Sequence, residues 1–178
     1  MIEKLIVDKI VFLDIDGVLN SEEWVDKCFK NDDVCDLDPE AINRLIKFLD
    51  DTNAKIVISS YWRSLNVQST ILEFSTSNHE LLKKLIPYII GVTPRFHKCR
   101  KRGNEIAYWI NMLSIDYNTL VKRCFILENI EISKNYRYVI VGDDNAMLRG
   151  QNFVQTDFQT GLTDEDVNEM KAFLEMLR

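Results

Sequence analysis

Two carboxylates one residue apart are the first side chains in the chain whose types and spacing could do chemistry. Asp14 and Asp16 follow the apolar run 10–13, and Gly17 comes directly after them. The run is short, β-branched and aromatic, which predicts a buried strand, and side chains two residues apart on a strand point the same way. Two ionised carboxylates side by side repel each other unless a cation or a proton lies between them. The pair therefore predicts a site for a hard divalent cation such as Mg²⁺.

Two further predicted strands also end in polar residues. Strand 55–58 is followed by two serines, and strand 136–141 by a glycine and two aspartates. Because ligands of parallel α/β sheets bind beyond the carboxyl ends of the strands, we expect these acids and hydroxyls to meet in one active site. The residues that it would bring together are Asp14, Asp16, Ser59, Ser60, Asp143 and Asp144.

The elements that must hold these residues alternate between strands and helices. This alternation predicts an α/β, Rossmann-like fold with a mostly parallel sheet flanked by helices. Residues 21–37 are polar and acidic and indicate a small excursion after the first strand, and residues 114–136 are compatible with a helix, a strand or an inserted hairpin. The expected strands are 10–13, 55–58, 88–92, 136–141 and a short one at 153–154. The expected helices start at 39 and near 66, 79 and 103, with a last one after a capping box at 163–166.

The bulk composition is that of one globular domain. The chain has 178 residues, of which 46% are hydrophobic and 28% charged, enough for a single core. No secretory signal and no membrane-spanning stretch is seen, so we expect a cytoplasmic protein whose four cysteines are reduced thiols. A net charge of −6 argues against a general polyanion binder, although a local basic patch can act alone. Two histidines and no Cys-x-x-Cys pair argue against a zinc site.

The constellation of acids and hydroxyls suits phosphoryl transfer. The glycine signatures of P-loop and dinucleotide-binding proteins are missing from the sequence. One carboxylate can attack phosphorus and form an aspartyl-phosphate, while a second protonates the leaving oxygen and then activates water. A magnesium ion neutralises the phosphate, and fixed donors hold its oxygens. The residues therefore favour Mg²⁺-dependent phosphoryl transfer.

Four motifs in order carry a resemblance to a known family. Phe-Leu-Asp-Ile-Asp-Gly-Val-Leu-Asn at 12–20 resembles the first motif of the haloacid-dehalogenase-like (HAD) superfamily, and especially of the HAD domain of Swiss Army Knife RNA repair proteins and of polynucleotide phosphatases. Ser-Ser-Tyr-Trp-Arg at 59–63, Arg-Gly-Asn-Glu-Ile at 102–106 and Gly-Asp-Asp at 142–144 are similar to the later motifs of that subset. The resemblance spans roughly 10–162 and implies that residues 1–178 form a single HAD-like phosphatase domain with a minimal or absent cap.

The resemblance assigns roles to the acids. It implies that Asp14 is the nucleophile and a metal ligand, and that Asp16 is the general acid/base, whose backbone carbonyl also binds the metal. The fourth motif implies one further metal ligand, for which we prefer Asp143, with Asp144 second.

The resemblance also assigns the phosphate-binding residues. Ser59 matches the hydroxyl of the second motif, and Ser60 takes that place if the strand ends one residue later. Arg102 matches the basic residue of the third motif, where most relatives have lysine. Its basic neighbours Lys98, Arg100 and Lys101 remain alternatives for that role.

Residues around these motifs bear on the substrate. A basic cluster lies beside the third motif and consists of Arg95, His97, Lys98, Arg100, Lys101 and Arg102. Such a cluster suits a phosphodiester backbone, and Arg63 and Trp62 would add a phosphate contact and a stacking surface. The alternatives are that Trp62 is partly buried core and that the cluster is a solvated loop.

We favour removal of a terminal 3′-phosphate from nucleic acid. A small-molecule phosphatase for nucleotides or sugar phosphates, and a non-catalytic phosphate- or nucleic-acid-binding module, are the alternatives, and the oligomeric state is left open.

Overall fold

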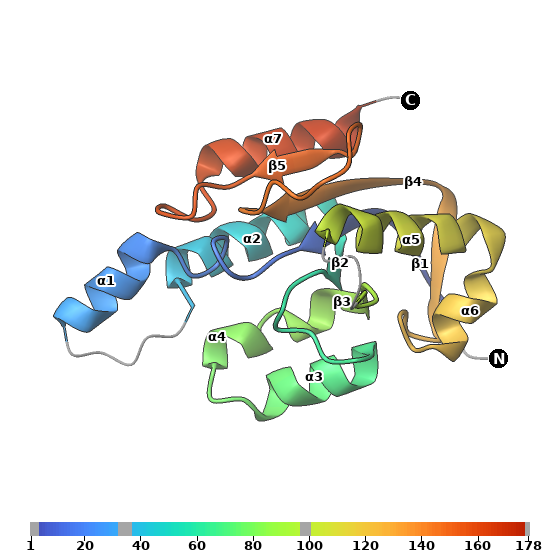
Figure 1. Ribbon diagram of the computed structural model, residues 1–178, viewed down its shortest axis with the longest axis horizontal. Helices are drawn as coiled ribbons and strands as arrows, with labels where there is room; N and C mark the ends of the chain where they lie inside the picture. The colour runs from blue at the N-terminus through green and yellow to red at the C-terminus, as the bar shows by residue number, and fades with distance from the viewer. Residues whose placement is uncertain (1–3, 32–36, 97–100, 177–178) are drawn as a thin grey trace.

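Five parallel strands form the centre of the structure, a computed structural model that describes residues 4–31, 37–96 and 101–176. The strand order is β3-β2-β1-β4-β5, and helices lie on both sides of the sheet (Figure 1). This arrangement confirms the predicted α/β fold with a parallel sheet. The strands are β1 (Leu5–Leu13), β2 (Lys55–Ile58), β3 (Ile89–Val92), β4 (Ile130–Gly142) and β5 (Phe153–Gln155).

Several helices begin where the sequence provides a capping residue. The Asp38 side chain accepts a hydrogen bond from the Glu40 backbone N–H at the start of α2, and Thr163 and Asp166 form a reciprocal capping box before α7. The helices are α1 (Glu22–Lys30), α2 (Pro39–Thr52), α3 (Val67–Thr76), α4 (Glu80–Lys83), α5 (Arg102–Ile115), α6 (Tyr117–Lys122) and α7 (Asp164–Glu175), with a 3₁₀ turn η1 (Ile86–Tyr88).

The core consists of two hydrophobic clusters, one on each face of the sheet. Alternate residues of β1 belong to different clusters: Val11 and Leu13 to the first, Ile10 and Phe12 to the second. Helices α2, α3 and α7 cover the first cluster, and α5 and α6 cover the second. Burial on both faces explains why β1 is a continuous apolar run at its carboxyl end.

Three segments differ from the sequence-based expectation. The excursion at 21–37 contains helix α1, which begins after an N-cap serine, Ser21. The segment 114–136 contains α6 and the first part of β4. The pairing of β4 with β1 changes register between Val7 and Lys9. The helix expected near 79–86 is only one turn long: α4 ends at Lys83, and the separate turn η1, which contains Pro87, follows it.

Two predictions from composition concern membranes and thiols. Within the described ranges, no helix has both the length and the apolar character that crossing a bilayer requires. Cys28 and Cys124 are free thiols. The remaining cysteines, Cys35 and Cys99, lie outside the described residues.

Candidate active site

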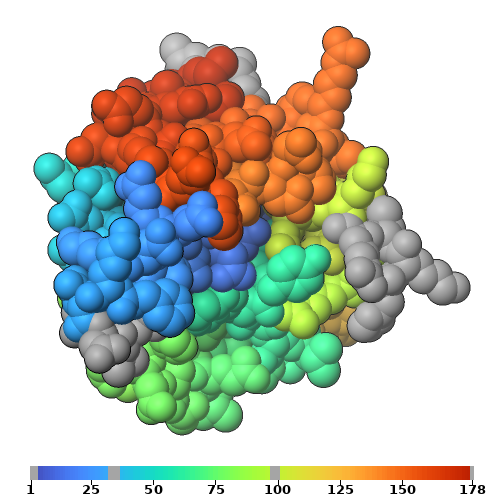
Figure 2. All heavy atoms as spheres, turned by 60° about the vertical axis from the view of Figure 1, so that its left-hand side comes forward, coloured from blue at the N-terminus to red at the C-terminus, as the bar shows by residue number. Residues whose placement is uncertain are grey.

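The carboxyl ends of the three predicted strands lie next to one another. The backbone N–H of Asp14 donates to the Val141 carbonyl at 3.0 Å, and the N–H of Ser59 donates to the Leu13 carbonyl at 2.8 Å. Asp14 therefore leaves the sheet between β2 and β4. Figure 2 shows the segment after β1, in dark blue, recessed between α1, the teal loop after β2 and the orange segment near β5.

Asp14 is a buried carboxylate with several donors, and only 8% of its surface is exposed. Its Oδ1 accepts the Ile15 backbone N–H at 2.8 Å, and its Oδ2 lies 3.3 Å from Nη2 of Arg102. Burial raises the pKa of Asp14 above its ordinary value, and the charge of Asp143 adds to this, although Arg102, the Ser60 hydroxyl and the Ile15 N–H oppose it. The carboxylate is thus held in place at a position where burial disfavours its charged form.

Asp16 is oriented by two donors that come from different elements. Its Oδ1 accepts Nδ2 of Asn20 and the indole Nε1 of Trp62, both at 2.9 Å. Asn20 also closes the turn, because its Oδ1 accepts the Gly17 backbone N–H at 3.0 Å. Gly17 has φ +67°, a conformation that glycine adopts at little cost.

Trp62 is half-buried and packs against the first core cluster, with its ring centroid 5.1 Å from that of His79. Its indole N–H is used by Asp16. These contacts favour the alternative in which Trp62 is partly buried core rather than a stacking surface. The hydrogen bond to Asp16 is a contact that the sequence reasoning missed.

Asp143 rather than Asp144 faces the other acids. A Cβ atom on Gly17 would lie 2.5 Å from Cγ of Asp143, so this carboxylate packs against the turn that carries Asp16. Burial raises the pKa of Asp143, and the charges of Asp144 and Asp16 add to this effect. Asp144 is exposed, and its Oδ1 accepts the Ala146 backbone N–H. In the part of the chain that the structure describes, no group of three or more His, Cys, Asp or Glu side chains is arranged to hold a metal ion.

The two serines after β2 have different partners. The Ser59 hydroxyl accepts a hydrogen bond from Thr93 Oγ1 at 3.2 Å, on the side of β3. The Ser60 hydroxyl contacts the Asp14 carboxylate and accepts the Trp62 backbone N–H. The geometry therefore favours Ser60, our second choice, as the hydroxyl beside Asp14.

Arg102 is a buried cation at the start of α5. Besides its contact with Asp14, its Nη1 lies 3.8 Å from Oε2 of Glu105, and its Cζ lies 4.9 Å from the ring centroid of Tyr61. Its Nε is buried and has no hydrogen-bond partner. A buried donor without a partner costs free energy unless a ligand supplies an acceptor. The N-terminus of a helix also favours anions.

Arg63 is not available to a substrate, and the predicted phosphate contact is wrong. Only 2% of Arg63 is exposed. Its Nε donates to the Thr93 carbonyl at 2.8 Å, and its Nη2 donates to the Pro94 carbonyl at 3.0 Å and to Oε2 of Glu105 at 2.6 Å. Its Nη1 donates to the Ser60 carbonyl. Arg63 therefore joins the loop after β2 to α5, as a structural residue.

The basic cluster beside the third motif is described only in part. The Arg95 side chain donates to the backbone carbonyls of Tyr61 and Arg63. Lys101 is exposed at the start of α5. The predicted contact of Lys98 lies outside the described residues, as do His97 and Arg100.

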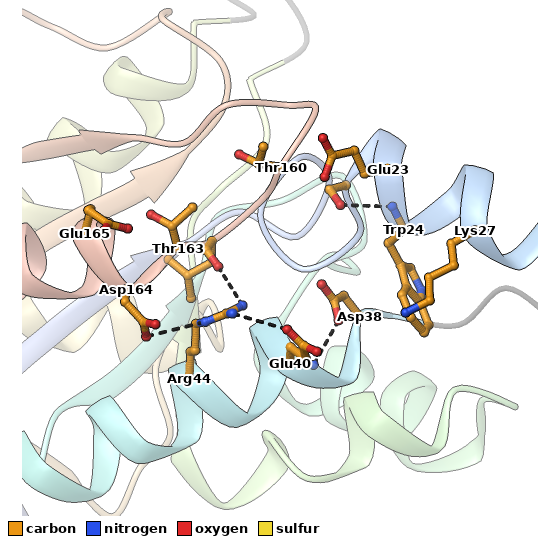
Figure 3. A pocket seen from close by; sticks show the side chains of 12 residues that line it. Glu23, Trp24, Lys27, Asp38, Glu40, Arg44, Thr160, Thr163, Asp164 and Glu165 are labelled. Atoms are coloured by element: carbon orange, nitrogen blue, oxygen red, sulfur yellow. Dashed lines mark hydrogen bonds and ion pairs between the residues drawn. The ribbon is translucent and has the colours of Figure 1, made fainter.

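A polar pocket of about 480 Å³ lies between α1, α2 and the segment before α7 (Figure 3). Neither Asp14 nor Asp16 lines it. Of its two cations, Arg44 is already paired with Glu40 at 3.3 Å and Asp164 at 3.4 Å, and Lys27 lies over the ring of Trp24. Because most of its charged side chains are acidic, we do not assign the phosphate to this pocket. Its ionisable residues are Glu23, Lys27, Asp38, Glu40, Arg44, Asp164 and Glu165.

Comparison with protein families gives a match over most of the chain. The model for the HAD domain in Swiss Army Knife RNA repair proteins matches residues 10–167, from β1 to the start of α7. No curated protein and no solved structure matches the chain. The matched range contains every candidate site residue described above.

Proposed function

The chain belongs to the family of HAD domains found in Swiss Army Knife RNA repair proteins, and from that premise we propose that it removes a terminal 3′-phosphate from nucleic acid. The family supports a phosphatase-type function of the HAD kind. The observation that carries the proposal is the buried guanidinium of Arg102, which lies 3.3 Å from Asp14 and whose Nε has no partner. A phosphoryl oxygen would give that donor an acceptor beside the nucleophile.

The residues support a reaction in two steps. A carboxylate oxygen of Asp14 attacks phosphorus, and the bond from phosphorus to the ester oxygen breaks as Asp16 gives that oxygen a proton. Asp16 then takes a proton from water, whose oxygen attacks phosphorus and breaks the bond to Asp14. Inorganic phosphate leaves, and both carboxyl groups return to their starting states. Ser60 and Arg102 hold the phosphoryl oxygens during both steps.

The donor set fits Mg²⁺. Burial raises the pKa of Asp14 and of Asp143. The charge of Asp143 adds to the rise at Asp14, and the charges of Asp144 and Asp16 add to the rise at Asp143. Mg²⁺ is typically bound by one or two carboxylates, with water and substrate phosphate completing its shell, so a larger group of acids is not required. When bound, the ion would supply positive charge that lets an anionic carboxylate approach a phosphate. We propose that Asp14, Asp143 and the Asp16 backbone carbonyl would hold it.

Phosphate release from a 3′-phosphorylated oligonucleotide tests this function. We expect release that requires Mg²⁺, stops with a chelator and exceeds release from the matching 3′-mononucleotide. The rate at low substrate concentration should fall as salt rises, because phosphodiester contacts release counterions. Faster release from the mononucleotide would instead favour a small-molecule phosphatase. No release from either substrate would contradict the proposal.

Replacing Trp62 with Phe should reduce turnover while leaving stability nearly unchanged. The phenyl ring keeps most of the packing but removes the N–H that donates to Asp16. A hydrogen bond to a charged group contributes about 1.5–3 kcal/mol, and partial exposure reduces this, so we expect kcat to fall about three- to tenfold. Steady-state rates and thermal unfolding would measure both effects. Trp24→Phe in α1 is the matched control. An equal loss of kcat in that variant would show that the hydrogen bond from Trp62 to Asp16 is not the cause.

A further inference from the structure

Tyr61 presents an aromatic ring at the edge of the active site, and the steps proposed above do not use it. It lies in the loop after β2, between Ser60 and Trp62, and 69% of its surface is exposed. The ring is therefore accessible to a ligand, and covering its apolar surface would be favourable.

Arg102 fixes one face of this ring. Its Cζ lies 4.9 Å from the Tyr61 ring centroid, a cation–π contact, while its Nη2 lies 3.3 Å from Asp14. One guanidinium therefore separates the nucleophile from the ring. Because Arg102 occupies one face, the exposed area of Tyr61 lies on its other face and its edge.

The backbone that carries the ring is also held in place. The Arg95 guanidinium donates to the Tyr61 carbonyl, and the Trp62 backbone N–H donates to the Ser60 hydroxyl at 3.3 Å. Arg63, two residues on, is buried and donates to the carbonyl of Thr93, in the segment after β3. The ring is thus a preorganised surface, and little conformational entropy is lost when a flat ligand packs on it.

We propose that Tyr61 stacks on the nucleobase of the nucleotide whose phosphate Asp14 attacks. The inference rests on the proposed function and names how the site recognises its substrate. A terminal nucleotide carries its base one sugar away from its phosphate, which matches a ring separated from the nucleophile by one guanidinium. Stacking also adds affinity without placing a second phosphate near the acids Asp14, Asp16 and Asp143. Because every base has a π-face, the site accepts different terminal bases with similar rates.

Pairs of substrates with and without the terminal base test this proposal. The pairs are a 3′-phosphorylated oligonucleotide and the same strand ending in an abasic 3′-phosphate, and a 3′-mononucleotide and ribose 3-phosphate. Tyr61→Leu removes the π-face at similar volume, and Tyr61→Phe keeps it. Leu65→Ala is the matched control, since Leu65 lies in the same loop and is 80% exposed.

We expect Tyr61→Leu to lower kcat/KM for the base-bearing member of a pair about tenfold or more, within the range of base–aromatic stacking, and to leave the abasic member within about twofold. Tyr61→Phe and Leu65→Ala should stay near the parent protein on all substrates. An equal loss on both members would mean that Tyr61 acts only by positioning Arg102, and no loss would mean that the ring does not touch substrate. Either result overturns the proposal.

A binding measurement separates this inference from the proposed function. If the parent protein releases no phosphate from any substrate, the phosphatase function fails, but the stacking contact can still be measured. Fluorescence anisotropy with Asp14→Asn protein compares affinity for the base-bearing and abasic oligonucleotides, with and without Tyr61→Leu. Affinity that depends on the base only when Tyr61 is present supports the stacking contact, and affinity that is independent of the base overturns it.

Discussion

Replacing Asp14 with Asn is expected to abolish phosphate release. The amide has nearly the same shape but is a far weaker nucleophile, so it cannot form the acyl-phosphate bond. We expect kcat to fall on the order of a thousandfold or more, as when other covalent nucleophiles are removed. The fold should persist, because an asparagine oxygen can still accept the Ile15 backbone N–H that now donates to Asp14. Phosphate release under single-turnover conditions measures the loss.

The control for this variant removes the same charge from a remote position. Asp51 is exposed at the end of α2, where it pairs with Lys171 at 3.2 Å. Asp51→Asn should therefore leave kcat within about twofold, since exposed ion pairs contribute little. Thermal unfolding of both variants separates lost chemistry from lost structure. A folded Asp14→Asn protein that turns over near the parent rate would exclude Asp14 as the nucleophile.

The fold was predictable because the signals that specify it are local. The apolar run before Asp14 indicated a strand buried on both faces, and the caps at Asp38 and Thr163 marked helix starts that the structure confirms. Helix α1 was not predicted, because most of its residues are polar and Cys28 is its single buried residue. The signal that could have identified it is Ser21 followed by two glutamates, a typical helix start.

The roles of individual site residues were harder to predict, because they depend on where a strand ends and on contacts distant in sequence. Ser59 and Ser60 are equally polar, and the strand end does not decide between them. β2 ends at Ile58, as expected, yet Ser60 contacts Asp14 while the Ser59 hydroxyl accepts a hydrogen bond from Thr93. Tyr61 and Trp62 are both aromatic, and the sequence does not tell which one is exposed. Arg63 was predicted to contact the substrate because its actual partner, Glu105, is distant in the sequence, and nothing near Arg63 indicates that the two side chains pair.

Replacing Glu105 with Gln is expected to cause the largest loss of stability among these variants. Glu105 accepts a hydrogen bond from Arg63 at 2.6 Å and from the Phe96 backbone N–H at 2.8 Å, and 8% of its side chain is exposed. Burial lowers the pKa of Arg63 to about 10, so this side chain is still charged at neutral pH. The variant therefore leaves a buried cation without its anion, which costs about 3–5 kcal/mol of unfolding free energy. Urea unfolding at neutral pH measures the change.

Burial, not the short distance, gives this ion pair its expected effect. The pair between Lys83 and Glu80 has the same separation of 2.6 Å, but 77% of the Glu80 side chain is exposed. Glu80→Gln should therefore change the unfolding free energy by no more than about 1 kcal/mol. If Glu105→Gln costs as little as Glu80→Gln, then water or a local shift must solvate Arg63. In that case Arg63 would no longer be a fixed link between the loop after β2 and α5. The position of Arg102 beside Asp14 would then depend on α5 alone.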